Sequence, residues 1–370
     1  MFEFKGGIQL YLAILLKALQ QLGMNVSYHV FLKHDTCASP DASFSRDTRF
    51  DCSGTWSLPL RTFIFATKIL GYGLGRHPNL VISGHLNFTP VAYWLKCIIG
   101  VPYWVIVYGI DAWNIERQNL KVALAHAERI LSISNYTRAR LLKEQNLDPN
   151  KILLLPCTFD LNRFKISPKP QHLLNYYGLT ANQPIILTVA RLDRTKRYKG
   201  YIQILKALPE IRRQIPQVHY ILVGKGSDRA RIEQLITNLN LQDCVTLTGF
   251  VPDEELCDHY NLCDVFAMPS KGEGFGIVYL EALACGKPTI GGNQDGAIDA
   301  LCQGELGVLV DPDNIGEITQ TIIQIVQGIY PHPLIYQPEV LRQKVIDTYG
   351  FERFKQTLAE LLQTTELGVQ

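Results

Sequence analysis

The sequence predicts an α/β protein made of two doubly wound halves, each built on a parallel sheet. Short runs of β-branched and apolar residues alternate with amphipathic helical stretches along the whole chain. This alternation is typical of parallel strands joined by right-handed crossovers. The length of 370 residues is too great for one ordinary domain and suits two. The 47% hydrophobic content indicates an ample core, and the near-neutral net charge of +2, without a basic stripe, excludes nucleic-acid binding.

In the first half, apolar residues follow the helical 3,4 spacing from residue 8 to residue 22, which predicts a helix there. The strands expected after it are Val26–Leu32, Leu80–Ile82, Trp104–Val107, Ile130–Ile133 and Ile152–Leu155. Residues Thr36 to Thr55 are polar and predict an irregular loop. Only Met1–Phe4 lead into the first turn, too few for a core strand, so we expect the first strand to be truncated.

A polar stretch from Asn162 to Gln183 carries two prolines and marks the region of the domain boundary. The strands expected beyond it are Ile185–Val189, Tyr220–Val223, Val245–Leu247, Val265–Met268, Pro288–Ile290 and Val308–Val310. We therefore predict one domain over residues 1–165, a second over 166–348, and a helix over 349–370 that packs back on the first domain.

The spacing of the cysteines and the apolar runs indicate in which cellular compartment the protein acts. The nine cysteines are odd in number and lack zinc-site spacing, so we expect free buried thiols in a reducing cytosol. The apolar stretch from Leu80 to Ile110 includes His85 and Lys96, which favours a strand, a helix and a strand over a membrane span. We expect a cytoplasmic protein, and peripheral attachment to the inner face of a membrane stays open.

The most informative segment is Ser270–Ala282, which follows the expected strand Val265–Met268. It contains two carboxylates eight positions apart: Glu273 in a glycine-rich turn and Glu281 on the helix that follows. In open α/β sheets, ligands sit at the carboxyl ends of the strands. Glycines let a ligand approach the main chain, and a helix N-terminus favours anions. The segment therefore predicts a binding site for an anionic ligand.

Together with Cys285–Pro288, this segment matches a Glu-(seven residues)-Glu motif, and the chain resembles the retaining glycosyltransferases of the GT-B fold, the bacterial family called glycosyl transferases group 1. The resemblance implies two Rossmann-like domains facing a central cleft, with the acceptor domain at 1–165 and the donor domain at 166–348. It implies transfer of a sugar from a nucleotide-diphosphate sugar to an acceptor hydroxyl with retention, in polysaccharide or glycolipid synthesis.

The resemblance also assigns roles in the donor pocket. Glu273 would orient the hydroxyls of the donor sugar, and Glu281 would accept hydrogen bonds from the ribose, which suits an ionised carboxylate. The other expected donor-binding residues act mainly through main-chain groups, and they are Gly224, Gly249, Phe250, Val251, Gly274, Phe275, Gly276 and Ile277.

By the same resemblance, Arg191 and Lys199 would grip the donor diphosphate. Fixed cations stabilise the negative charge that grows on a departing phosphate more than they stabilise the ground state. Other cations nearby could substitute for them: Arg194, Lys196 and Arg197. The only Asp-x-Asp string, Asp311–Asp313, is expected to be a surface turn, so the implied enzyme needs neither a metal nor another cofactor.

In the first half, the resemblance places His85 beside the donor sugar as a catalytic residue and Gly6-Gly7 near the donor diphosphate or the acceptor. Tyr108 and Asp111 are candidates for contact with a carbohydrate or lipid-linked acceptor, and Tyr108 stands where relatives more often carry a histidine. In the second half, Asp299 is a candidate supporting residue. Two alternatives stay open: a nucleotide-sugar epimerase of the same fold, and a non-catalytic subunit that binds nucleotide sugars.

Overall fold

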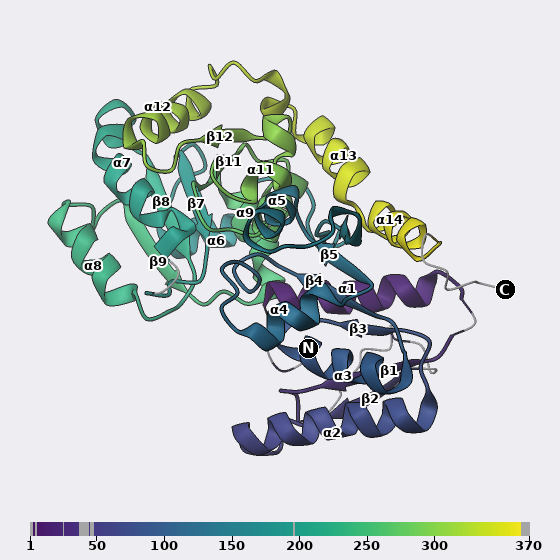
Figure 1. Ribbon diagram of the computed structural model, residues 1–370. Coiled ribbons are helices and arrows are strands. Elements are labelled where there is room, and N and C mark those ends of the chain that lie inside the picture. The colour runs from purple at the N-terminus through teal and green to yellow at the C-terminus, as the bar shows by residue number, and fades with distance from the viewer. Residues whose placement is uncertain are drawn as a thin grey trace. The chain divides into compact units, whose positions relative to one another are not determined.

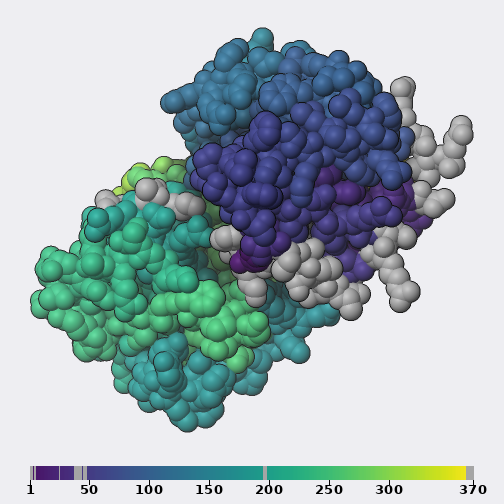
Figure 2. All heavy atoms as spheres, turned by 90° about the horizontal axis from the view of Figure 1, so that it is seen from below, coloured from purple at the N-terminus to yellow at the C-terminus, as the bar shows by residue number. Residues whose placement is uncertain are grey.

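The structure, a computed structural model, describes Glu3, residues 6–24, 26–36, Phe44, 48–194 and 197–363, without the side chain of Arg197. Its contacts divide the chain into two units, Met1–Thr158 with Phe351–Gln370, and Phe159–Gly350. Figure 2 shows the heavy atoms of both units, the first mainly in purple and blue and the second mainly in teal and green. The domain boundaries predicted from the sequence follow residues 165 and 348, whereas the boundaries between the two units in the structure follow residues 158 and 350.

The first unit contains two parallel sheets, with strand orders β1-β2 and β3-β4-β5-β6 (Figure 1). Its described elements are α1 (Gly7–Gln21), β1 (Tyr28–Leu32), β2 (Thr48–Cys52), α2 (Leu58–Arg76), β3 (Val81–Ser83), α3 (Thr89–Ile99), β4 (Tyr103–Val107), α4 (Gln118–Ala125), β5 (Arg129–Ser132), α5 (Asn135–Glu144), β6 (Ile152–Leu154) and α14 (Phe351–Gln363). The expected first helix and the segment read as strand, helix and strand are confirmed.

One expectation in this unit is wrong, because β2 lies inside the stretch taken as an irregular loop. Thr48 to Cys52 pairs in parallel with Tyr28 to Leu32. Three of its five residues are polar and none is fully buried, so it lacks the apolar run that marks a core strand. The expected truncated first strand falls on residues that, apart from Glu3, lie outside the described ones.

The core of the first unit gathers around β4, whose five residues are all buried. The last helix, α14, packs against α1 in this unit: the rings of Phe354 and Tyr11 meet edge to face with centroids 5.7 Å apart. The Tyr11 hydroxyl donates a hydrogen bond of 2.9 Å to the carbonyl of Leu155, beyond β6. The final helix is therefore part of the first unit although it follows the second in sequence.

The second unit is built on a six-stranded parallel sheet, with strand order β12-β11-β10-β7-β8-β9. Its elements are α6 (Gln171–Tyr177), β7 (Ile185–Val189), α7 (Tyr201–Gln214), β8 (His219–Val223), α8 (Arg229–Asn238), β9 (Val245–Gly249), α9 (Leu256–Leu262), β10 (Val265–Met268), α10 (Ile277–Ala284), β11 (Thr289–Gly292), α11 (Ala297–Ala300), β12 (Val308–Val310), α12 (Ile315–Val326) and α13 (Pro338–Tyr349). This is the doubly wound order of a Rossmann sheet, and its direction of winding reverses between β7 and β10.

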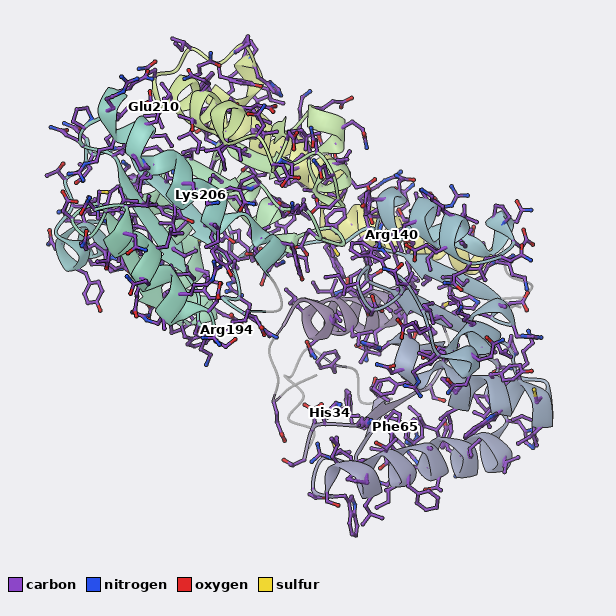
Figure 3. All side chains as sticks on the ribbon, turned by 60° about the vertical axis from the view of Figure 1, so that its left-hand side comes forward. His34, Phe65, Arg140, Arg194, Lys206 and Glu210 are labelled. Carbon is purple, nitrogen blue, oxygen red and sulfur yellow. The ribbon has the colours of Figure 1, made fainter. Side chains whose placement is uncertain are left out.

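Amphipathic helices cover this sheet. α7 and α12 pack side by side, and α7 buries Ile204, Leu208 and Ile211 in the core. Figure 3 labels Lys206 and Glu210 one turn apart on the same helix, and Lys206 is exposed. A face of apolar residues three and four positions apart is what a helix needs to cover a sheet.

No helix in the described parts of the chain is long and apolar enough to cross a membrane. Eight cysteines lie within the described residues, and those that are buried are Cys157, Cys244, Cys263 and Cys285. Cys37 lies outside the described residues.

Candidate functional site

The loops that follow β7 and β10 lie at the point where the second sheet reverses its winding. The helices after two such neighbouring strands pack on opposite faces, which opens a crevice for ligands at the carboxyl ends of the strands. Arg191 and Lys199 follow β7, and Glu273 follows β10. The topology of this unit alone therefore brings these three predicted residues to one edge of the sheet.

Main-chain contacts hold these two loops together. Lys199 ends a short 3-10 turn, and Gly200 follows it with φ of +82°. A Cβ atom on Gly200 would lie 2.4 Å from the carbonyl oxygen of Pro269, so this close approach requires glycine. The amide of Lys271 donates a hydrogen bond of 2.9 Å to the carbonyl of Tyr198. The β7 loop is thus fixed against the β10 loop.

Lys199 and Glu273 form an ion pair between these loops, and each side chain is 16% exposed. The ammonium of Lys199 also lies 5.3 Å from the centre of the Tyr198 ring. Burial raises the pKa of Tyr198; the charge of Glu273 raises it further, and that of Arg191 lowers it. The negative charge of Glu273 and the positive charge of Arg191 therefore both act on Tyr198, a residue that no sequence motif singles out.

The other cations of the β7 loop are less well placed. Arg191 is exposed, and so is Arg194, which Figure 3 labels on this loop. Lys196 and the side chain of Arg197 lie outside the described residues. Lys199 is the candidate cation that contacts a predicted catalytic carboxylate.

Asp295 organises the turn that carries Glu273, and sequence reasoning missed it. The side chain is wholly buried. One carboxylate oxygen accepts hydrogen bonds of 2.7 Å from the amides of Gly272 and Glu273 and from the hydroxyl of Ser270. The other accepts one of 2.9 Å from the amide of Ala297. Burial raises the pKa of Asp295, and these hydrogen bonds oppose the rise.

The main chain around Asp295 also touches the Glu273 turn. The amide of Gly296 donates a hydrogen bond of 2.8 Å to the carbonyl of Glu273. A Cβ atom on Gly296 would lie 2.1 Å from the carbonyl oxygen of Gly274. The expected supporting residue, Asp299, is buried on α11, four positions further on. An acid three residues after the neighbouring strand β11 was the signal that could have identified Asp295.

The glycine-rich turn buries its aromatic side chain. Phe275 is buried and meets Tyr349 edge to face at 5.5 Å. Gly276 has φ of +91° and precedes Ile277, the first residue of α10. A Cβ atom on Gly276 would lie 2.6 Å from the ring of Tyr279. Amides of this turn, at the start of a helix, are the groups that remain for an anionic ligand.

Glu281 is buried on α10, where it accepts a hydrogen bond of 2.7 Å from the hydroxyl of Tyr260. Burial raises the pKa of Glu281 to about 7, against the lowering effects of Tyr260 and Arg163. The expected ionised acceptor is therefore a carboxyl group that titrates near neutral pH. Tyr260, its partner on α9, was not singled out from the sequence.

The carboxyl ends of β8 and β9 meet the β7 loop through glycine. Gly224 has φ of +143°, and a Cβ atom there would lie 1.8 Å from the carbonyl oxygen of Ala190. Its amide donates a hydrogen bond of 2.9 Å to the carbonyl of Gly249. Beyond Gly249, Phe250 is 61% exposed, whereas Val251 is buried. Phe250 thus presents an aromatic surface beside the loop.

In the first unit, His85 follows β3 and its Nδ1 accepts a hydrogen bond of 3.1 Å from the amide of Asn87. Burial, followed by the charge of Lys33, lowers the pKa of His85, so the imidazole is neutral near pH 7. The Tyr108 hydroxyl donates a hydrogen bond of 3.2 Å to the carbonyl of Gly84. His85 and Tyr108 therefore lie close together after two neighbouring strands.

Asp111 closes the turn after β4, where its Oδ1 accepts a hydrogen bond of 2.9 Å from the amide of Tyr108. Its Oδ2 is buried and has no hydrogen-bond partner within the described part of the chain. Burial raises the pKa of Asp111 to about 7. Asp111 thus offers an unoccupied acceptor or, when protonated, a donor.

The two glycines predicted near the donor lie at the start of the first helix. Gly6 caps the N-terminus of α1, and Gly7 is its first residue.

Within the described residues, no group of three or more His, Cys, Asp or Glu side chains could hold a metal ion. Asp311–Asp313 forms the turn after β12, in which Asp311 accepts a hydrogen bond of 2.9 Å from the amide of Asp313. Asp313 pairs at the surface with Lys271. The string is a turn, as its proline suggested.

Comparison with known proteins places both halves of the chain in described families. Residues 175–332 match the family described as Glycosyl transferases group 1, and residues 5–163 match Glycosyltransferase Family 4. The GDP-mannose-dependent alpha-(1-6)-phosphatidylinositol monomannoside mannosyltransferase of Mycolicibacterium smegmatis is 31% identical over 64% of this chain and 62% of its own length. The O-antigen chain mannosyltransferase B of Escherichia coli is 29% identical over 57% of this chain and 54% of its own length. The chain thus spans about half to two thirds of these relatives.

Solved structures agree on the fold. HepE of Anabaena, in complex with UDP-glucose, superposes with a TM-score of 0.78 at 22% identity, covering 98% of this chain and 97% of the other. Sucrose-phosphate synthase of Thermosynechococcus elongatus gives a TM-score of 0.79 at 23% identity, covering 97% and 93%. With two family matches, one in each half, and this architecture, the chain belongs to the glycosyltransferases of the GT-B fold.

Proposed function

We propose that the protein transfers a hexose from a nucleotide-diphosphate sugar to an acceptor hydroxyl, with retention at the anomeric carbon and without a metal ion. The observation that carries the proposal is the Lys199–Glu273 ion pair, held between the loops after β7 and β10 where the sheet reverses. A sugar diphosphate has a negative charge for the cation and hydroxyls for the carboxylate. Family membership supplies the class of reaction.

In this mechanism the bond between the sugar and the diphosphate breaks as the acceptor approaches from the same face. Lys199 and Arg191 stabilise the growing charge of the leaving phosphate. The ammonium of Lys199 has three donors, so it can bind a phosphate oxygen while it keeps Glu273 in place. Glu273 orients the sugar hydroxyls, and the departing phosphate oxygen takes the proton of the acceptor.

GDP-mannose is the donor we propose first. Two of the relatives described above are mannosyltransferases, and one is GDP-mannose-dependent by name. HepE, which binds UDP-glucose, shares only the fold. Phe250, exposed beside Gly249, offers a ring on which a purine base can stack.

For the acceptor we propose a molecule that carries a negative charge, such as a phosphate-bearing lipid. Basic groups gather at the carboxyl ends of β1 and β3 in the first unit. Arg61 Nη1 lies 3.4 Å from Nδ1 of His34. Besides burial, the charge of Lys33 lowers the pKa of His34 and of His85. Burial and the charge of Arg61 also lower the pKa of Lys33. An anionic ligand would relieve the repulsion between these two cations.

A cytoplasmic enzyme that attaches to the inner face of a membrane fits this acceptor. α2 exposes Leu58 (61%), Leu60 (45%) and Phe63 (67%). The helix carries three basic residues and no acidic one. Apolar residues edged by cations suit the surface of an anionic bilayer. This attachment is part of the proposal, together with the lipid acceptor.

Donor binding is expected to depend on pH through Glu281, whose carboxyl has a pKa of about 7. If the ribose binds the ionised form, KM for the donor should be about tenfold higher at pH 6 than at pH 8. The reason is that the fraction of protein with an ionised Glu281 decreases as the pH is lowered. Steady-state kinetics across this range would check it. The Glu281→Gln variant should bind more weakly with a flat profile; a profile unchanged from the natural protein would remove Glu281 from the ribose site.

Incubation with GDP-mannose and vesicles containing phosphatidylinositol, with and without EDTA, tests the proposed reaction. We expect an α-mannoside by proton NMR and a rate within about twofold of that without chelator. A β-linked product would exclude retention, and loss of activity with EDTA would exclude metal independence. Conversion of the donor without acceptor would indicate the epimerase, and GDP binding without turnover the non-catalytic subunit.

A further inference from the structure

Two cysteines of the second unit lie close together, one on α9 and one at the end of α10, the helix that carries Glu281. Cys257 is on the first turn of α9, and Cys285 caps the C-terminus of α10. Their sulfur atoms are 4.0 Å apart, although the residues are 28 positions apart in sequence. Neither residue has a role in the reaction proposed above, and the pair could not be predicted from the spacing of the cysteines along the chain.

The two thiols have different surroundings. Cys257 is partly exposed, and the side-chain amide of Asn261 lies 3.4 Å from its sulfur as a donor. The hydrogen bond with Cys285 is the largest of the effects that lower the pKa of Cys257 to about 6, so Cys257 is the more acidic thiol of the two. Cys285 is fully buried, and its hydrogen bond to Cys257 together with burial raises its pKa.

We propose that Cys257 and Cys285 form a reversible disulfide, with Cys257 reacting first with a peroxide and Cys285 resolving the product. The Cys257 sulfur attacks hydrogen peroxide, the O–O bond breaks, and a sulfenic acid and one water form. The Cys285 sulfur then attacks the Cys257 sulfur; the S–O bond breaks and hydroxide leaves as a second water with the Cys285 proton. Two thiols are oxidised and one peroxide is reduced. An exposed, acidic thiol beside a resolving thiol is the usual arrangement of redox-sensitive cysteines.

The disulfide would act on the site through the helices that carry it. A disulfide bond of about 2.05 Å requires the sulfurs to approach by roughly 2 Å. One helical turn from the cysteines, Tyr260 of α9 donates its 2.7 Å hydrogen bond to Glu281 of α10. We expect oxidation to displace this pair and raise KM for the donor about threefold or more, since hydrogen bonds weaken steeply with geometry. This consequence rests on the proposed function, whereas the disulfide does not.

Peptide mapping tests the disulfide directly. The purified protein is treated with hydrogen peroxide, its free thiols are blocked, and it is cleaved before aspartate residues. Asp258 and Asp264 separate Cys257, Cys263 and Cys285 into three peptides. We expect the Cys257 and Cys285 peptides to be joined, and dithiothreitol to separate them. Unlinked peptides, or a link from Cys285 to Cys263, would overturn the proposal.

Cysteine variants test the disulfide independently of whether the protein catalyses the proposed transfer reaction. Cys257→Ser and Cys285→Ala should each abolish the link, and Cys263→Ala, which alters a buried cysteine of the same region, should keep it. Because Cys285→Ala alters the core, the partly exposed Cys257→Ser is the decisive variant. Binding of GDP to oxidised protein should weaken in the natural chain and not in Cys257→Ser. An unchanged affinity in linked protein would refute the effect on the donor site.

Discussion

Replacement of Lys199 by alanine is expected to lower kcat by about 10²–10³ while the fold persists, because one preorganised charge at the leaving group is lost. Glu273→Gln should abolish measurable transfer, since the amide cannot hold the Lys199 ion pair and the sugar hydroxyls in the same way. Both side chains are partly exposed at 16%, so neither change opens a cavity in the core. Steady-state kinetics with saturating donor, together with thermal unfolding, measures both effects.

Lys271→Ala is the matched control for these variants. Lys271 lies in the same loop as Glu273, but it pairs with Asp313 at the surface and is 43% exposed. Its removal changes the net charge of the site region as Lys199→Ala does, without touching the Lys199–Glu273 pair. We expect its activity to match that of the natural protein. Full activity in Lys199→Ala or Glu273→Gln would contradict the assigned site.

The second large effect is expected from Asp295→Asn, which changes one atom of a buried side chain. Three donors converge on one of its oxygens, and a fourth meets the other. The NH₂ group of asparagine must face at least one of these donors, which leaves a buried amide unpaired. We expect a loss of about 2–4 kcal/mol in unfolding free energy. Transfer activity should fall as well, because the turn that positions Glu273 loses its support.

Urea denaturation and activity assays would measure this change, with Asp311→Asn as the control. Asp311 also accepts hydrogen bonds in a turn, from the side chain of Gln294 and the amide of Asp313, but it is partly exposed. Its replacement should alter stability by less than about 1 kcal/mol. Equal stability and activity in the two variants would show that Asp295 does not organise the turn.

Much of the second unit follows from its sequence. The expected strands Ile185–Val189, Val265–Met268 and Val308–Val310 have the same bounds in the structure. They are apolar because both faces of a parallel sheet are covered by helices. β2 escaped prediction because a half-buried strand has no such run. Strand order was beyond reach from periodicity alone, since it depends on which edges pair across the chain.

The candidate site shows the same division. Glu273 and Lys199 could be identified because motif positions mark them, and the structure brings them into contact. Asp295, Tyr198 and Tyr260 could not, because each acts through a partner that is distant in sequence. Asp295 binds a turn 22 residues away, and Tyr260 binds Glu281 21 residues away. Contacts between residues so far apart cannot be predicted from local sequence patterns.

A crystal structure of the protein with GDP tests the central claim most directly. We expect the diphosphate at the carboxyl ends of β7 and β10, within hydrogen-bonding distance of Lys199 and Arg191, with amides of the Gly274–Ile277 turn close by. Nucleotide bound at any other place, or a diphosphate held by a divalent ion with Lys199 still facing only Glu273, would contradict a donor site built on these cations.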